Sequence, residues 1–82
     1  RIDCDEATKF AVVEDAARHF AATYPVQTID GVRISWPDGW GLLRASNTQA
    51  VLVMRFEATS VAGRDAHEEE VRAWLRAQGV AA

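Results

Sequence analysis

The sequence predicts an α+β domain in which two helices cover one face of a small, mostly antiparallel, four-stranded sheet. Two segments, one near each end of the chain, carry apolar residues at steps of three and four, which is typical of amphipathic helices. Between them, apolar segments of strand length are separated by short turn sequences. The chain has 82 residues, so we expect one domain over residues 1–82.

The start of the chain is expected to form a strand over residues 1–4. Because the sequence begins with Arg1 inside that strand, we expect the chain to be a piece cut from a larger protein. Cys4 is the single cysteine, so no disulfide can form within the chain. We interpret it as a small apolar side chain of the core.

The first helix is expected over residues 6–24. Asp5 is the expected N-cap, and Pro25 ends the helix because proline lacks the backbone donor. Glu14 and Arg18 are four residues apart and are expected to pair on the solvent side. The core side of the helix is expected to consist of Phe10, Val13, Ala17, Phe20, Ala21 and Tyr24.

The middle of the chain carries strand patterns. Turn sequences at residues 30–31 (Asp-Gly) and 37–39 (Pro-Asp-Gly) separate the apolar segments, and such short links predict antiparallel pairing. Residues 51–56 are apolar on both faces except at Arg55, which predicts a central strand. The expected segments are residues 26–30 (a short extension or strand), 32–36, 40–45 and 50–59.

A second helix follows the last strand. Asp65 and Glu68 form a capping-box-like start, and Gly79 is suited to the position just after the helix. Glu68 is expected to pair with Arg72. The acidic run at residues 68–70 is interpreted as a solvated face near the positive end of the helix dipole. The apolar stripe is Val71, Trp74 and Leu75.

Composition excludes several classes of protein. The hydrophobic fraction of 49% argues against a disordered chain. Nine Lys and Arg against 12 Asp and Glu give a net charge of −3, so we expect no nucleic-acid partner. The longest aliphatic run, residues 50–54, is far below the ~20 residues of a membrane span, so no membrane partner is expected either.

The link at residues 44–50 carries the clearest chemistry. Arg44 has a planar guanidinium that matches phosphate oxygens, and Ser46, Asn47 and Thr48 add neutral donors. Exposed backbone N–H groups of such a loop can form an anion-binding nest. The link has no carboxylate or imidazole, so it offers no general base, nucleophile or metal ligand. From the residues alone, an ordinary connecting loop is the more common explanation.

Other residues admit a structural and a functional interpretation, and the structural one is favoured. Arg55 could reach an anion site, but an ion pair with Glu57 is expected instead. His19 and His67 lack the spacing of metal ligands. An aromatic sugar platform is the less favoured interpretation of three residues expected in the core or on the sheet face: Trp36, Trp40 and Trp74.

Three segments carry a resemblance to a known family: DGVR at residues 30–33, DGWGLLRASNT at 38–48 and VLVMRFEA at 51–58. In this order they closely resemble the C-terminal domain of bacterial phosphomannomutase/phosphoglucomutase, in the α-D-phosphohexomutase superfamily. The resemblance covers nearly the whole chain. It implies a fold like that of the TATA-box-binding protein.

In that family, four domains surround a large cleft. The resemblance implies that this chain is the fourth domain, which binds the substrate phosphate that is not transferred and closes over the cleft by hinge rotation. Carried over residue by residue, the phosphate-binding residues would be Arg44, Ser46, Asn47 and Thr48. Asn47 is typical of this branch, since the phosphoglucosamine mutase branch usually has glycine there.

The resemblance also implies an activity for the whole enzyme. A cytoplasmic isomerase would transfer a phosphoryl group reversibly between C6 and C1 of mannose or glucose phosphates, through a sugar bisphosphate. A phosphoserine in the first domain and Mg²⁺ in the second would perform the transfer, outside this chain. The expected partners are the phosphosugar and the remaining domains, and the chain alone is expected to be inactive.

The chain departs from the family pattern after Thr48. The family often continues with Thr-Pro, whereas Gln49 and Ala50 stand here. Loss of the proline removes a fixed φ angle, so a more mobile loop is expected. The alternative from a different class of function is a non-catalytic protein-interaction module that uses the sheet face.

Overall fold

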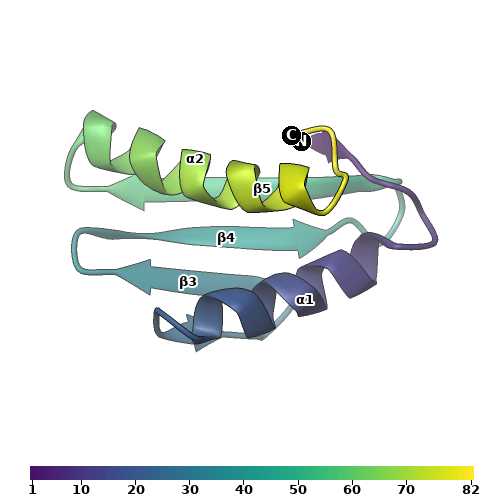
Figure 1. The fold of residues 1–82 in the computed structure, drawn as a ribbon, viewed down its shortest axis with the longest axis horizontal. Coiled ribbons are helices and arrows are strands. Elements are labelled where there is room, and N and C mark those ends of the chain that lie inside the picture. Colours follow the sequence, from purple (N-terminus) through teal and green to yellow (C-terminus); the bar gives the residue numbers. More distant parts are fainter.

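An antiparallel sheet forms one layer of the molecule and two helices form the other, as the computed structural model of residues 1–82 shows (Figure 1). The strands lie side by side in the order β1-β5-β4-β3-β2. In chain order the elements are β1 (Ile2–Asp3), α1 (Lys9–Ala21), β2 (Val26–Gln27), β3 (Val32–Trp36), β4 (Gly39–Ala45), β5 (Val51–Ala58) and α2 (Val61–Ala77).

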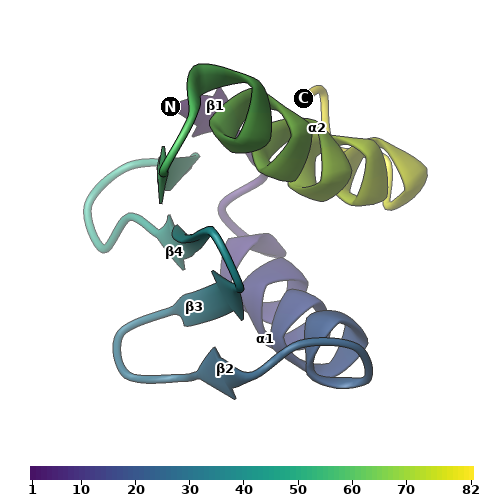
Figure 2. The ribbon, with the colours of Figure 1, turned by 90° about the vertical axis from the view of Figure 1, so that its left-hand side faces the viewer.

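Both helices lie on the same face of the sheet, which the end-on view shows directly (Figure 2). Helix α1 contacts β2, β3 and β4, whereas α2 contacts β4 and β5. The predicted α+β class, the antiparallel pairing and the two helices on one face are therefore confirmed. Neither helix is both long and apolar enough to cross a membrane.

The sheet has five strands, one more than predicted. The extra strand is β2, which pairs Val26 and Gln27 with β3 and ends three residues before the expected end at Asp30. Strand β5 pairs with β4 from Leu52 to Ala58, but β1 reaches only Val51 and Leu52. The prediction of a central strand therefore holds only for the start of β5, and β4 has neighbours along both sides.

The core lies between the sheet and the helices. Strand alternation turns Val32, Ile34 and Trp36 of β3 toward the helices, and each is less than a tenth exposed. Burying an aliphatic or aromatic side chain of this size stabilises the fold by about 1.5–3 kcal/mol. The same layer contains Cys4, as predicted, together with Ile2, Val13, Ala16, Phe20, Leu43, Ala45, Leu52, Val71 and Leu75.

Helix α1 is shorter than predicted, and Asp5 is not its N-cap. The Asp5 side chain accepts a hydrogen bond from Ala7 N (2.9 Å), which is an Asx turn that precedes the helix. Thr8 occupies the N-cap position without a side-chain cap. The predicted pair of Glu14 with Arg18 is also wrong, because Arg18 pairs with Asp15.

The predicted core side of α1 is confirmed at Val13 and Phe20, whereas Ala17 and Tyr24 are only partly buried. Its buried residues are Lys9, Val13, Ala16 and Phe20, at steps of four, three and four. Phe10, which was expected in the core, therefore lies at the flank and is 51% exposed. Ala21 is exposed as well. Lys9, not Phe10, occupies the inward position at the start of the helix.

Helix α2 begins earlier than predicted. Ser60 is its N-cap, with extended backbone and a side-chain oxygen that accepts from Gly63 N (3.0 Å). Asp65 and the acidic run 68–70 therefore lie inside the helix, away from its N-terminus. The predicted Glu68–Arg72 pair (2.8 Å) is confirmed, and Gly79 follows the helix with φ +89°.

Candidate functional site

The predicted site residues lie together at one end of the sheet. Strand β4 ends at Ala45, β5 begins at Val51, and residues 46–50 link them. Ser46 N donates to Val51 O (3.0 Å), which closes the link into a tight hairpin. We call residues 46–50 the β4–β5 loop; Arg44 stands just before it.

Ser46 organises the inside of the β4–β5 loop. Its side-chain oxygen accepts from Thr48 N (3.3 Å) and Gln49 N (3.2 Å), and the residue is only 9% exposed. These two amides therefore point toward Ser46, and the outward-facing nest expected from the sequence is not formed by them. Because the hydroxyl oxygen accepts twice, its proton is left to donate away from the loop.

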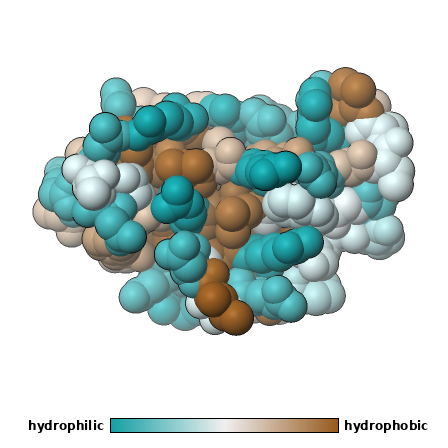
Figure 3. Space-filling view, turned by 180° about the vertical axis from the view of Figure 1, so that it is seen from behind, coloured by the Kyte–Doolittle hydropathy of each residue, from teal (hydrophilic) through white to brown (hydrophobic).

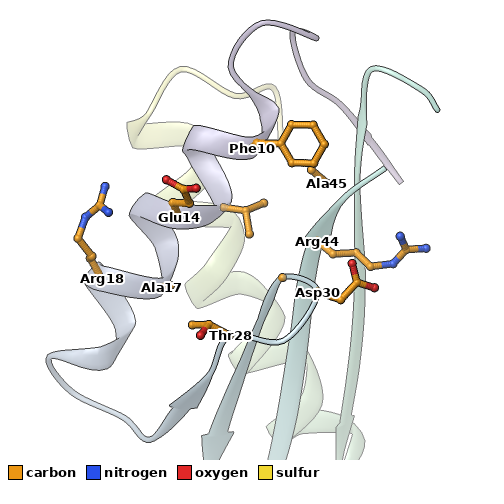
Figure 4. Close-up of a pocket in the computed structure, with 10 residues that line it drawn as sticks. Phe10, Glu14, Ala17, Arg18, Thr28, Asp30, Arg44 and Ala45 are labelled. Carbon is orange, nitrogen blue, oxygen red and sulfur yellow. The ribbon is translucent and has the colours of Figure 1, made fainter. Parts of the chain in front are cut away.

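Arg44 lies on the face of the sheet that the helices do not cover. The burial pattern of β4 alternates, with Leu43 and Ala45 buried and Arg44 half-buried between them. In the close-up its side chain points away from α1, beside Asp30 (Figure 4). No hydrogen bond or ion pair holds its guanidinium. By contrast, carboxylates pair with Lys9, Arg18, Arg55, Arg64, Arg72 and Arg76.

The Asp30-Gly31 turn packs against the backbone of Arg44. Gly31 has φ +114°, and a Cβ there would lie 2.5 Å from Leu43 O and 2.7 Å from Arg44 Cβ. Only glycine allows both this backbone conformation and this close approach. The turn therefore fixes where the Arg44 side chain leaves the sheet.

A cavity of about 460 Å³ lies beside Arg44, between α1 and the β2–β3 turn (Figure 4). Charged side chains of both signs, apolar surface and the Arg44 stem line it, among them Phe10, Glu14, Arg18, Thr28 and Asp30. The residues of the β4–β5 loop do not line this cavity. Asn47 and Thr48 are exposed instead, so the loop presents an open surface site.

Lys9 is the residue at this end that the sequence analysis missed. Its side chain is fully buried, and Nζ donates to Gln49 O in the β4–β5 loop (2.9 Å). The spacing of Lys9 to Val13, Ala16 and Phe20 is the sequence signal that could have identified it. A lysine at a core position of a helix is rarely fully buried unless it is paired.

The tryptophans occupy core and sheet-face positions, as predicted. Trp36 is buried and stacks on His67, with ring centroids 4.1 Å apart. Trp74 packs against Phe20, on the helix side of the sheet. Trp40 lies on the uncovered face, where the Arg33 guanidinium lies 4.3 Å from its ring centroid.

Arg55 also lies on the uncovered face of the sheet. Its predicted ion pair with Glu57 is confirmed, at 2.9 Å. Seen from this side, apolar surface is interrupted by hydrophilic side chains (Figure 3). The exposed large apolar residues come from separate elements and are Phe10, Ile29 and Val61. This surface gives no specific support to the interaction-module alternative.

Two hydrogen-bonded pairs lie toward the other end of the sheet. His67 Nε2 lies 2.7 Å from Asp38 Oδ1, and this hydrogen bond lowers the pKa of Asp38. Tyr24 donates its phenolic proton to Glu70 (2.7 Å), which raises the pKa of Tyr24. No group of three or more His, Cys, Asp and Glu side chains is placed to hold a metal ion.

Comparison with known proteins places this geometry in a family. Residues 1–73 match the family model described as phosphoglucomutase/phosphomannomutase, C-terminal domain. The phosphomannomutase/phosphoglucomutase of Pseudomonas aeruginosa PAO1 is 50% identical over 58 residues, which cover 70% of this chain and 12% of that protein. The enzyme of the same name from Pseudomonas putida KT2440 is 41% identical over 78 residues, covering 94% of this chain and 16% of that protein.

A solved structure agrees with these sequence matches. It is the X-ray crystal structure of a phosphoglucomutase/phosphomannomutase family protein from Burkholderia thailandensis, with a TM-score of 0.61 and 42% identity. The similarity covers 74% of this chain and 15% of that one. The chain thus spans only about 12–16% of the length of these relatives.

Proposed function

This chain belongs to the family of phosphoglucomutase/phosphomannomutase C-terminal domains, and on that premise we propose that its β4–β5 loop binds the phosphate group of a phosphosugar. The binding groups would be the Arg44 guanidinium and the side chains of Ser46, Asn47 and Thr48. The ligand would be a mannose or glucose phosphate, or the bisphosphate intermediate between them.

The observation that carries the proposal is the unpaired guanidinium of Arg44. Six of the nine Lys and Arg side chains pair with a carboxylate. Three do not: Arg1, Arg33, which lies over the Trp40 ring, and Arg44, which alone of the three directly precedes the β4–β5 loop. A guanidinium forms strong, two-pronged hydrogen bonds with phosphate oxygens. The unpaired guanidinium of Arg44 lies next to exposed hydroxyl and amide groups, and this arrangement suits an anion that comes from outside the chain.

The β4–β5 loop supplies neutral donors around this charge. The Ser46 hydroxyl accepts from two loop amides, so its own proton can be given to a phosphate oxygen. Asn47 and Thr48 are exposed at the tip and can turn toward the same ligand. A site that recognises only the phosphate would serve a substrate bound in either of two orientations, as a mutase requires.

In the whole enzyme, we propose that this domain binds and orients while other domains perform phosphoryl transfer between C6 and C1. Binding energy from a phosphate that does not react can favour closure of the cleft. The loop offers no nucleophile or general base, so the isolated chain would be inactive. A Mg²⁺ ion would be held by a domain outside this chain. The enzyme would be cytoplasmic.

Replacing Arg44 tests the proposal. A charged hydrogen bond contributes about 1.5–3 kcal/mol, so we expect Arg44→Ala to weaken the affinity for glucose 6-phosphate about 10- to 100-fold without lowering the melting temperature. Arg64→Ala is the matched control, because Arg64 is exposed and pairs only with its neighbour Asp65. Equal affinities of the two variants, measured by calorimetry or NMR titration, would show that Arg44 does not bind the phosphate.

A further inference from the structure

We infer that Lys9 is a positioning residue for the β4–β5 loop, an inference that rests on the proposed function of that loop. Lys9 is the first residue of α1, and its side chain has an exposed fraction of 0%. A buried ammonium is strongly destabilising unless hydrogen bonds and an opposite charge compensate it. The groups that contact the Lys9 ammonium therefore indicate the role of this buried residue.

Three contacts surround the Lys9 ammonium. Nζ forms an ion pair with the Glu6 carboxylate, at 2.8 Å from Oε2 and 3.1 Å from Oε1. It donates to the backbone oxygen of Gln49, at 2.9 Å, across 40 residues of sequence. It also lies 5.1 Å from the centroid of the Phe10 ring. Glu6 and Phe10 lie within three residues of Lys9 in the sequence, whereas Gln49 belongs to the β4–β5 loop, 40 residues away.

The contact with Gln49 fixes the second half of the loop. Gln49 N donates to the Ser46 side chain, so both backbone polar groups of Gln49 are held. The next carbonyl, that of Ala50, accepts from Cys4 N at 2.9 Å. Gln49 and Ala50 are thus hydrogen-bonded to α1 and to the segment after β1. Because Gln49 also bonds to the Ser46 side chain, these contacts orient Ser46 at the centre of the loop.

The side chains in the first half of the loop are not held by contacts of this kind. The side chains of Asn47 and Thr48 are exposed and make no hydrogen bond within the chain. The loop thus combines a fixed base with a tip left for a ligand. A fixed base lowers the conformational entropy that must be lost when the tip closes on an anion.

Lys9 acts through the loop and not by touching the ligand. None of its side chain reaches the surface, so a phosphate at the exposed tip cannot contact it. The Glu6 carboxylate offsets its charge, which reduces any long-range attraction for an anion. Its effect on binding therefore depends on the hydrogen bond to Gln49 O.

The test is an NMR titration of this chain with inorganic phosphate and with glucose 6-phosphate. Lys9→Met keeps the length of the side chain but removes the donor and the charge. We expect the affinity of the folded variant to fall roughly 3- to 10-fold, which corresponds to one hydrogen bond of about 0.5–1.5 kcal/mol. Amide hydrogen exchange at Thr48 and Gln49 should become faster. Lys9→Leu also lacks the donor and the charge, and it serves the same test if Lys9→Met does not fold.

Two controls separate positioning from stability and from charge. Val71→Ala opens the core under α2, so it should lower the melting temperature but leave the phosphate affinity of the folded protein unchanged. Glu6→Gln removes the counter-charge but keeps the Lys9–Gln49 bond, so it should bind within about twofold of the unaltered chain. An affinity loss of equal size in Val71→Ala would show that binding follows stability, and the positioning role would be wrong.

The inference and the proposed function can fail separately. If Lys9→Met and Lys9→Leu bind phosphate like the unaltered chain while Arg44→Ala binds weakly, Lys9 does not position the loop and the phosphate site stands. If Arg44→Ala also binds normally, the phosphate site itself is wrong, and the inference about Lys9 is wrong with it.

Discussion

The two ends of the sheet use their polar groups differently. At the β3–β4 hairpin end, Asp38 bonds to His67, its carbonyl accepts from Thr59 N at 2.9 Å, and Ser60 caps α2. At the β4–β5 loop end, the Arg44 guanidinium and the side chains of Asn47 and Thr48 have no hydrogen-bond partner within the chain. At the hairpin end these polar groups bond within the chain and join the sheet to α2, whereas at the loop end the Arg44 guanidinium and the Asn47 and Thr48 side chains remain available to a ligand.

The hairpin end also holds a stack of two aromatic rings. The rings of Trp36 and His67 stack at 4.1 Å with an interplanar angle of 13°. The indole N–H of Trp36 is buried without a hydrogen-bond partner, so the packing of its large apolar ring must offset that cost. Near the loop end, by contrast, two polar residues are buried, Lys9 and Ser46, and each is held by hydrogen bonds.

The largest difference between the ends should come from their glycines. A Cβ at Gly39 would lie 2.2 Å from Glu57 O and 2.7 Å from Ala58 Cα, so Gly39→Ala forces β4 and β5 apart. We expect chemical denaturation to give a free energy of unfolding lower by about 2–3 kcal/mol, with the phosphate affinity of the folded protein unchanged.

Gly31→Ala is the matched change at the loop end. Its φ of +114° and the contact with Arg44 Cβ predict a loss of stability of about 1–3 kcal/mol together with weaker phosphate binding. The comparison would break if Gly31→Ala lost stability but bound phosphate normally, or if Gly39→Ala lost affinity.

A smaller effect is expected from the Asp38–His67 hydrogen bond. Because this bond lowers the pKa of Asp38 below its ordinary 3.8, the carboxylate stabilises the fold above that pH. The stabilisation is lost as the pH falls through the lowered pKa. Melting temperatures over an acid series should therefore show Asp38→Asn less stable than the unaltered chain near neutral pH, with the difference vanishing well below pH 3.8. A difference that stayed constant with pH would exclude this origin.

The smallest effect concerns Tyr24, the single tyrosine of the chain. Its hydrogen bond to Glu70 raises its pKa above 10.0. The ultraviolet absorbance of the phenolate follows this titration without interference from other tyrosines. In Glu70→Gln the midpoint should move back toward 10.0, with little change in phosphate binding. An unchanged midpoint would show that Glu70 is not the cause.

Local sequence patterns predicted most of the fold. Alternation over residues 32–36, the Asp-Gly turns and the apolar steps of both helices depend on neighbours in the sequence, and they placed these elements correctly. The helix starts were wrong because several side chains near each start can cap. Ser60 prevails over Asp65 because β5 ends just before it, and Asp5 forms its own turn instead.

The candidate site was predictable where its residues are contiguous. Arg44 and the loop residues after it follow one another in the sequence, so their meeting at one end of the sheet needs only a hairpin. The inward turn of the Ser46 oxygen and the burial of Lys9 were not predictable. Lys9 meets Gln49 across 40 residues, and such a contact depends on the packing of α1 against the sheet.

The most direct test of the central claim is to titrate this chain with glucose 6-phosphate and to follow its backbone amides by NMR. Binding at the β4–β5 loop predicts chemical-shift changes concentrated at Ser46, Asn47, Thr48 and Gln49, with none at Asp38 and Gly39 in the opposite hairpin. Loop amides that stay unchanged at high ligand concentration, or shifts centred on the hairpin, would contradict the assignment of the phosphate site.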